Sequence, residues 1–433
     1  MRPRWTTRPS ARTGPVSIVA LLDSATLNLP DTSEFLIKPY RAHFTPDYVQ
    51  RPSIGYSRDT FGRGFFGGSA VQLSDMLGNQ QLLFAGYVNG SFVESQVLAA
   101  YSNVAHRLNW ATGISQDPYF YLEANEIVSG SPTPEENTFV THIRRLILRQ
   151  AFVQAAYPFS RFRRVELALR MNNVKDDDLQ ILEPYDPATG FPTRDPELFT
   201  AHNPGATYVQ PSIALVHDNT IFGYTGPFYG HRWRFEAAQN IGTWRFTQLL
   251  GDYRRYDQIA GPVIFATQLF YFGRMGRDAN QFQVFAGSTD LIRGQTSGSY
   301  IRNECKNSAD AGTQTGCVQL DRLVGSQVAL GKFELRFPIL TPQVFRKLPL
   351  GFPPIEGAAF YDVGLAWNKG STLKWKEAPG DETNPAVRTP LHTVGLSARM
   401  NLFGLMVIRL DWSHPLNRTG VTSLWTLSLG PTF

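Results

Sequence analysis

Apolar and polar residues alternate along most of this chain, from about residue 64 onward. The segment 425–429 shows the pattern clearly. Trp425, Leu427 and Leu429 fall on one face of an extended strand, and Thr426 and Ser428 fall on the other. No stretch keeps the 3.6-residue period of an amphipathic helix for long. We therefore expect an all-β protein in which helix is a minor component.

The alternating runs predict sixteen antiparallel strands separated by turns of unequal length. The candidate strands are 64–73, 80–92, 95–103, 106–116, 139–157, 161–173, 207–217, 229–238, 242–254, 260–271, 281–287, 325–337, 355–367, 391–401, 404–413 and 423–433. Some junctions are very short, whereas 174–206, 288–324 and 368–390 are long and polar. An even strand number with short turns at one end and long loops at the other is typical of a bacterial outer-membrane β-barrel.

Composition favours a barrel over a helical membrane protein. Hydrophobic residues make up 42% of the 433 residues, and no run approaches the ~20 apolar residues that a spanning helix needs. Aromatic residues reach 13%, which suits the aromatic girdles of a barrel. A soluble all-β protein with half-exposed sheets stays open as the alternative.

The alternation assigns a face to each strand residue. In the closing strand, Trp425, Leu427, Leu429 and Phe433 are predicted to face the lipid. Trp412 of the preceding strand is predicted to face the lipid as well. Arg409 and Asp411 share the opposite face of their strand and are expected to line the lumen. Lys332, Glu334 and Arg336 oppose an apolar face in the same way.

The formal net charge of +5 does not indicate nucleic-acid binding, because the basic residues are scattered singly through the strands. Cys305 and Cys317 enclose eleven polar and glycine-containing residues, with no histidine or further cysteine nearby to complete a metal site. We expect a disulfide in an oxidising compartment, and we expect neither a metal nor a cofactor.

Residues 1–60 are predicted to form an extended lead-in and residues 61–433 the barrel domain. The apolar run Val16–Leu22 is short for a signal peptide, so we expect an upstream signal and periplasmic part. The segment from Phe35 to Tyr56 is expected to dock at the periplasmic rim.

The sequence offers little for catalysis. His217 with Asp218, and His414 with Asp411, lie close along the chain, so a Ser-His-Asp barrel hydrolase stays open. No Gly-x-Ser-x-Gly elbow, His-Glu-x-x-His helix or phosphate loop occurs. The acidic run 176–178 is interpreted as a solvated loop rather than a calcium site.

Four segments, in order, resemble the barrel domain of the BamA/TamA outer-membrane assembly family (bacterial surface antigen). They are VHDNTIFGYTGPFYGHRWRFE (Val216–Glu236), TDLIRGQTSGSY (Thr289–Tyr300), FELRFPI (Phe333–Ile339) with GAAFYDVGLAW (Gly357–Trp367), and the terminal hairpin LSARMNLFGLMVIRLDWSHPL with its closing strand. The second resembles the family's Arg-Gly-aromatic signature on the sixth external loop. Here Gln295 replaces the aromatic residue, which is a departure from that pattern.

The resemblance implies a structural role for Arg293 and Gly294. A loop folded back into the lumen would place the Arg293 guanidinium against inner-wall carboxylates, for which Glu334 and Asp362 are the candidates by alternation. The alternative is a solvated arginine in an ordinary Arg-Gly turn.

The implied function is insertion or translocation of proteins at the bacterial outer membrane. The seam between the first and last strands would open so that an exposed edge pairs with a client strand. Glycines at 64, 67 and 68 would weaken this seam. The implied partners are the lipid bilayer, client outer-membrane proteins and a periplasmic domain or subunit. A passive porin, a barrel hydrolase and the anchor of a longer polypeptide remain the alternatives.

Overall fold

The structure is a computed structural model, and it describes residues 40–59, 62–281, 283–300, 304–305, 317–340, 354–381, 383–402, 406–418, 420–421 and 423–429. The chain divides into two compact units, 1–42 and 43–433. Only residues 40–42 of the first unit are described.

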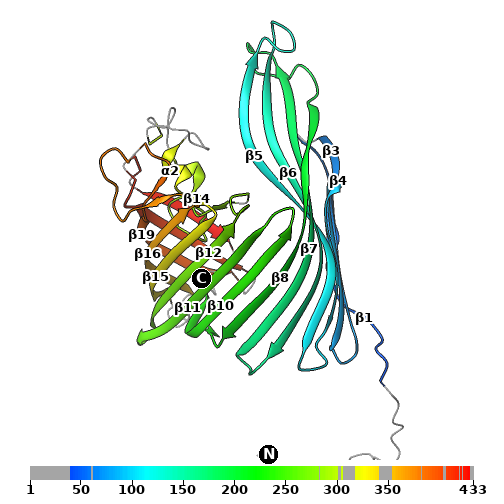
Figure 1. Cartoon of the computed structure of the whole chain (residues 1–433), viewed down its shortest axis with the longest axis vertical. Helices are drawn as coiled ribbons and strands as arrows, with labels where there is room; N and C mark the ends of the chain where they lie inside the picture. The colour runs from blue at the N-terminus through cyan, green and yellow to red at the C-terminus, as the bar shows by residue number, and fades with distance from the viewer. Residues whose placement is uncertain are drawn as a thin grey trace, which may run out of the picture. The chain divides into compact units, whose positions relative to one another are not determined.

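The second unit is dominated by one antiparallel sheet of seventeen strands (Figure 1). These strands are β1 (Thr45–Val49), β2 (Ser53–Asp59), β3 (Gly62–Ser74), β4 (Gln80–Asn103), β5 (Asn109–Ser129), β6 (Asn137–Pro158), β7 (Arg163–Tyr185), β8 (Glu197–Asp218), β9 (Ile221–Phe222), β10 (Pro227–Gly242), β11 (Phe246–Ala260), β12 (Val263–Gly276), β15 (Gln327–Leu340), β16 (Ile355–Trp367), β19 (Leu391–Leu402), β20 (Met406–Pro415) and β21 (Leu424–Leu429). The expected all-β, antiparallel fold is therefore confirmed.

Smaller elements lie in the connections between these strands. They are β13 (Val284–Phe285), which pairs with β14 (Val324–Gly325), β17 (Thr372–Leu373), which pairs with β18 (Val387–Arg388), the 3-10 turn η2 (Ser297–Ser299) and the helix α2 (Val318–Asp321). No helix in the described residues has the length and apolar character to cross a membrane.

Strand order follows chain order, because most strands pair with the next long strand along the chain. At the start of the sheet, β1 and β2 both pair with β3, so the sheet begins at Thr45 rather than near residue 61. Residues 45–49 and 53–56 of the segment that was expected to dock at the rim lie in these strands, and residues 35–39 lie outside the described residues. At the other end, β21 pairs with β20. Among the described residues, no pairing joins β21 to β1, β2 or β3.

The strand β4 turns back on itself. The Val104 amide donates to the Asn79 carbonyl at 2.8 Å, and the Tyr101 hydroxyl donates to Gln80 Oε1 at 2.8 Å. A straight strand of 24 residues would place its ends roughly 80 Å apart. The two ends of β4 can meet only if the chain reverses between them, as the separate predicted strands 80–92 and 95–103 require.

Two sequence predictions are wrong in this region of the fold. The expected polar loop 174–206 is mostly strand, because β7 continues to Tyr185 and β8 begins at Glu197. The expected strand 281–287 contributes only the two residues of β13, which pair with β14 outside the main sheet. β7 and β8 have 23 and 22 residues, about twice the ~9–11 that a membrane strand needs. These strands rise with β5 and β6 above the rest of the sheet (Figure 1).

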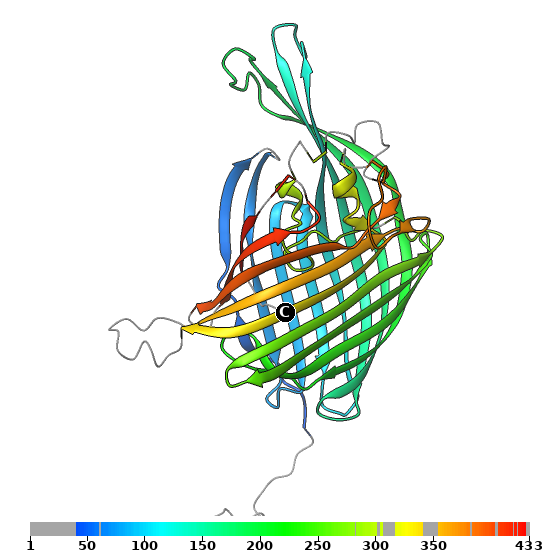
Figure 2. The ribbon, with the colours of Figure 1, turned by 90° about the vertical axis from the view of Figure 1, so that its left-hand side faces the viewer.

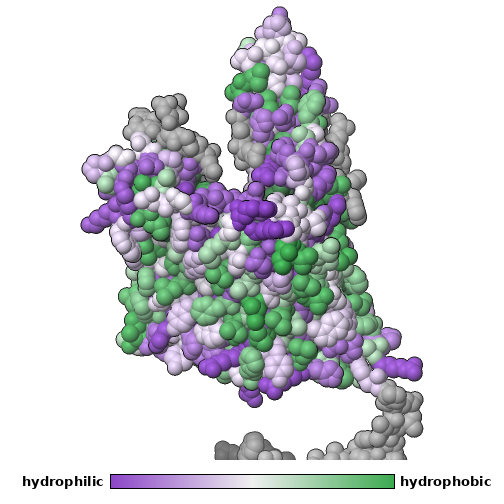
Figure 3. Space-filling model, in the orientation of Figure 1, coloured by the Kyte–Doolittle hydropathy of each residue, from purple (hydrophilic) through white to green (hydrophobic). Residues whose placement is uncertain are grey.

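The outer face of the sheet is apolar. Exposed side chains on it include Leu169, Ile213, Phe235, Leu269 and Leu427. Figure 3 shows hydrophobic residues over the lower strands and hydrophilic residues at the upper rim and the lower edge. An apolar face of this extent on a water-soluble sheet would be unfavourable.

The inner face of β15, β16, β19 and β20 is covered by the connection between β12 and β15, here called the inner loop (277–326, of which 277–281, 283–300, 304–305 and 317–326 are described). Figure 2 shows α2 and neighbouring parts of this loop inside the curve of the sheet. Ile292 of the inner loop is fully buried with Val328, Leu330 and Ala366 of the wall. Gly364 makes the space for it, since a Cβ there would lie 2.2 Å from Ile292 Cδ1. A hydrophobic core therefore forms between the loop and the wall.

Candidate functional site

Arg293 lies at the centre of the contact between the inner loop and the wall. Its Nε and Nη2 donate to the two carboxylate oxygens of Asp362 at 2.7 and 2.6 Å, and its Nη1 donates to Glu334 Oε1 at 2.7 Å. The three side chains are at most 1% exposed. Two parallel bonds to one carboxylate fix the plane of the guanidinium as well as its position.

Strand register brings the two carboxylates together. β15 and β16 pair so that Glu334 lies opposite Phe360, and Asp362 is two residues further along β16 on the same face. The Phe360 ring lies under the Arg293 guanidinium, 3.5 Å from its Cζ. The arginine therefore contacts two carboxylates and an aromatic face on adjacent strands.

Glu334 binds two further arginines. Arg399 of β19 donates to both of its oxygens at 2.6 and 2.7 Å, and Arg336 Nε donates to Oε2 at 2.9 Å. Buried charges are stable only when they are paired and hydrogen-bonded. Glu334 thus neutralises the charge of arginines that belong to the wall itself, whereas Asp362 binds the arginine of the inner loop.

The electrostatics of Arg293 follow from this environment. Burial opposes the charged form of the guanidinium, but the carboxylates of Asp362 and Glu334 outweigh it, so the pKa of Arg293 lies above its ordinary value.

Gly294 is required by both backbone conformation and space. Its φ is +75°, a region that residues with a Cβ rarely adopt, and an added Cβ would lie 3.1 Å from side-chain atoms of Ser413 and Thr393. The residue therefore does more than complete a turn, because it lets the loop backbone approach β19 and β20 closely.

Gln295 makes polar contacts where the family pattern has an aromatic residue. Its Oε1 accepts from the Tyr300 hydroxyl at 2.7 Å, and its Nε2 lies 3.5 Å from Thr393 Oγ1. Gln295 is fully buried. The departure thus replaces apolar packing by a hydrogen-bonded contact between the loop and β19.

Two further basic side chains bind the backbone of the inner loop. The sequence did not predict these contacts. Lys332 Nζ donates to the Asp290 carbonyl at 2.6 Å, and Arg409 Nη2 donates to the Thr289 carbonyl at 3.1 Å. Alternation placed both residues in the lumen, but their partners are backbone atoms of a distant loop. No sequence signal identifies such partners.

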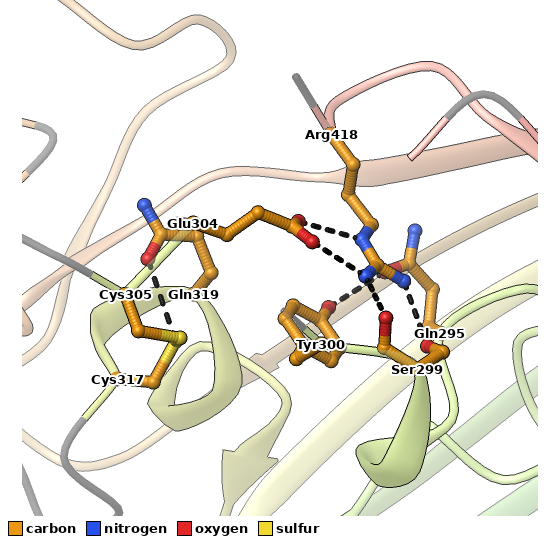
Figure 4. Close-up of a disulfide and its surroundings, with 8 residues drawn as sticks. All are labelled: Gln295, Ser299, Tyr300, Glu304, Cys305, Cys317, Gln319 and Arg418. Carbon is orange, nitrogen blue, oxygen red and sulfur yellow. Dashed lines mark hydrogen bonds and ion pairs between the residues drawn. A yellow bond between two sulfur atoms is a disulfide. The ribbon is translucent and has the colours of Figure 1, made fainter. Parts of the chain in front are cut away.

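Cys305 and Cys317 form a disulfide within the inner loop, with Cα atoms 4.7 Å apart (Figure 4). Cys317 immediately precedes α2, whose first residue, Val318, is fully buried. The bridge therefore ties residue 305 to the part of the loop that packs inside the sheet.

The short connection between β8 and β10 closes the same charged cluster from the other end of the strands. Thr225 Oγ1 donates to Glu356 Oε2 at 2.9 Å, and Arg336 Nη1 donates to the Pro227 carbonyl at 3.1 Å. Asn401 Nδ2 donates to the Tyr224 carbonyl at 2.6 Å. The cluster is therefore covered by loops at both ends.

The closing strand keeps the predicted alternation. Trp425, Leu427 and Leu429 are 65–67% exposed, whereas Arg409 and Asp411 on the facing strand β20 are buried. Phe433 lies outside the described residues.

The histidine pairs do not form a catalytic arrangement. His414 and Asp411 are three residues apart on β20, so their side chains point to opposite faces of the strand, and His217 and Asp218 are adjacent on β8 with the same result. Asp411 instead accepts from Ser397 Oγ at 2.6 Å. In the described residues, no group of three or more His, Cys, Asp or Glu side chains is placed to hold a metal ion.

The sequence suggested that the acidic run 176–178 is a solvated loop, but the structure places it in a strand. Asp176 and Asp177 lie on β7 and are buried. Arg144 Nη2 donates to Asp176 Oδ2 at 2.5 Å, and Arg145 Nη2 donates to Asp177 Oδ2 at 2.7 Å. The prediction is wrong because the arginine partners are 32 residues away, on β6.

Comparisons with known proteins give matches of structure only. No protein-family model and no curated protein matches the sequence. BamA from Haemophilus ducreyi, in a crystal structure lacking POTRA domains 1–3, aligns over 90% of this chain and 70% of that chain, with a TM-score of 0.55 and 13% sequence identity. CdiB from Acinetobacter baumannii aligns over 88% of this chain and 59% of its own, with a TM-score of 0.43 and 10% identity.

The alignment with BamA spans nearly the whole of this chain. At 13% identity it is a similarity of fold. The resemblance to the BamA/TamA family, which the sequence segments indicated, is therefore confirmed at the level of fold.

Proposed function

We propose that this chain is an outer-membrane β-barrel of the BamA/TamA type that takes part in inserting or translocating proteins at the outer membrane, or that anchors a periplasmic domain there. The observation that carries the proposal is the inner loop, which Arg293 fastens to Glu334 and Asp362 inside a sheet with the BamA fold. The polar inner face and the apolar outer face support placement in a bilayer.

The proposed barrel has sixteen membrane crossings. The count takes β1 and β2 as one interrupted crossing because both pair with β3, takes β4 as two because it turns back on itself, and omits the two-residue β9. An even number agrees with bacterial outer-membrane barrels. The seam of this barrel lies between β21 and the β1/β2 edge.

The proposed mechanism uses the backbone of that seam. A strand edge that lacks a partner offers a row of N–H and C=O groups, and an extended client segment can pair with them as an added strand. The inner loop contacts β15, β16 and β20 through charged side chains and β19 through Gln295, so it holds these four strands together. Movement is therefore confined to the seam while the rest of the wall stays fixed.

A reconstitution assay tests the proposal. The purified chain in liposomes is mixed with a small, urea-unfolded outer-membrane client, and folded client is followed by heat-modifiable gel mobility. Liposomes with the chain are expected to fold the client faster than empty liposomes, and Arg293→Ala is expected to lose most of this gain. The matched control is Arg277→Ala, since Arg277 is an exposed arginine at the start of the same loop.

Two results would overturn the proposal. Equal client folding with and without the chain, together with steady conductance in a planar bilayer without client, would favour the passive porin. Release of an acyl chain from lipid would favour the hydrolase, although the paired histidine and aspartate side chains point to opposite faces of their strands.

A further inference from the structure

A second buried arginine joins the inner loop to the last connection of the sheet. Arg418 lies between β20 and β21, and its side chain is 2% exposed. Its Nε and Nη2 donate to the two oxygens of Glu304, each at 2.9 Å. It also donates to Ser299 Oγ at 2.8 Å, to the Ser299 carbonyl at 2.7 Å and to the Gly294 carbonyl at 3.2 Å (Figure 4).

The Tyr300 ring completes this site, with its centroid 3.9 Å from Arg418 Cζ. In the part of the chain that the structure describes, the hydrogen bonds of Arg418 all end on residues 294–304 of the inner loop. Glu304 is only 3% exposed. Separating the pair would leave buried charges uncompensated, so the contact resists opening.

Arg418 lies close to the start of the closing strand. It precedes Leu424, the first residue of β21, by six positions. Arg418 also donates to the carbonyl of Gly294, and the residue before Gly294 is Arg293, which binds Asp362 of the wall. One end of the closing strand is therefore attached, through Arg418 and the loop, to the same cluster that holds the loop in the sheet.

We infer that Arg418 is a positioning residue that couples the inner loop to the closing strand, so that loop release and opening of the β21 edge occur together. The link to client handling rests on the proposed function. The coupling itself is a property of the fold and can be measured without a client.

The disulfide strengthens this coupling on the loop side. Glu304 is adjacent to Cys305, and the bridge to Cys317 restrains both next to the buried start of α2. Added dithiothreitol would reduce the bridge to two thiols and be oxidised to its own cyclic disulfide. Glu304 would then lose a covalent restraint but keep its charge, so reduction should have a smaller effect than loss of Arg418.

Hydrogen exchange of the full chain in lipid nanodiscs tests the inference. Peptides covering 292–300 and 424–429 are followed by mass spectrometry for the wild type and for Arg418→Gln. Exchange is expected to accelerate about tenfold or more in both peptides, because the same buried contact restrains 292–300 directly and 424–429 through the chain that follows Arg418. Arg277→Gln, at the exposed control arginine, should change neither.

Two further measurements keep the test decisive if Arg418→Gln fails to fold. Arg418→Lys keeps the charge but loses the bidentate geometry, and reduction of the folded wild type changes no residue. Both should accelerate the two peptides together, by less than Arg418→Gln. Acceleration of 292–300 alone, with 424–429 unchanged, would overturn the coupling.

The outcome separates this inference from the proposed function. Uncoupled exchange in a chain that still folds clients would remove the role of Arg418 and leave the function standing. Coupled exchange in a chain that folds no client would support the role of Arg418 and overturn the proposed function.

Discussion

The two faces of the strands β15–β21 have opposite patterns of burial. On the inner face, Lys332, Arg336 and Arg399 are at most 1% exposed although each carries a charge. On the outer face, Leu335 is 40% and Leu427 is 67% exposed. The difference arises because the inner loop covers one face, whereas no segment within the described ranges covers the apolar residues of the other. Burial here reports which face has a covering segment, rather than which residues are hydrophobic.

The largest expected effect comes from breaking the inner face. Arg293→Ala should lower the free energy of unfolding by about 3–5 kcal/mol, because it leaves the buried Asp362 carboxylate without the arginine that binds both of its oxygens, while Glu334 keeps Arg336 and Arg399. Urea titration of the chain in detergent, followed by heat-modifiable gel mobility, measures the loss.

A double-mutant cycle sharpens the assignment. Asp362→Ala in the Arg293→Ala background should add little further loss, since coupled sites are not additive. Strictly additive losses would return Arg293 to a solvated turn and would remove the distinction between the two faces.

The outer face should respond less strongly, and only to charge. Leu427→Arg is expected to cost about 2–4 kcal/mol if residue 427 lies near the bilayer midplane, because an ionised group there is not hydrated. Thr426→Arg is the matched control on the inner face, where it would lie opposite Asp411. Unfolding in lipid vesicles compares the two, and equal losses would overturn the register of the closing strand.

The smallest effect is expected in the tall hairpins β5–β8, where the contrast between faces is lost. Asp176 and Asp177 are adjacent on β7, so they point to opposite faces, yet both are buried. Asp177→Asn keeps the shape but removes the charge that Arg145, Lys175 and His202 contact. The expected loss is about 1–3 kcal/mol.

Limited proteolysis of the connections 130–136 and 186–196 provides the readout for this variant. Cleavage should become faster while the heat-modifiable mobility of the sheet stays the same. A loss of global stability as large as that of Arg293→Ala would show that the hairpins are part of the same cooperative unit.

Several features of the site could be predicted from sequence because they depend on local pattern. Period-2 alternation placed Glu334, Asp362 and Arg409 on the inner face and Leu427 on the outer face. The partners of these charges could not be predicted in the same way. Lys332 is an ordinary lumen residue by alternation, and only the folded loop shows that it binds the Asp290 carbonyl.

The sequence by itself determined the strand class, the facing of most strand residues and the antiparallel order, because side-chain direction in a strand follows a fixed two-residue period. It failed where the pattern carried no such signal. The polar segment 174–206 looked like a loop, since its strands carry charged residues on faces that are covered only after β6 and β7 pair.

The tertiary structure decided everything that depends on contacts between distant segments. Arg418 is 124 residues from Gly294 and 114 from Glu304, and Arg293 is 69 residues from Asp362. Ion pairs of this kind become favourable only when the fold removes both groups from water and brings them into contact. Their geometry is therefore a property of the folded sheet and its inner loop, and no local stretch of sequence specifies it.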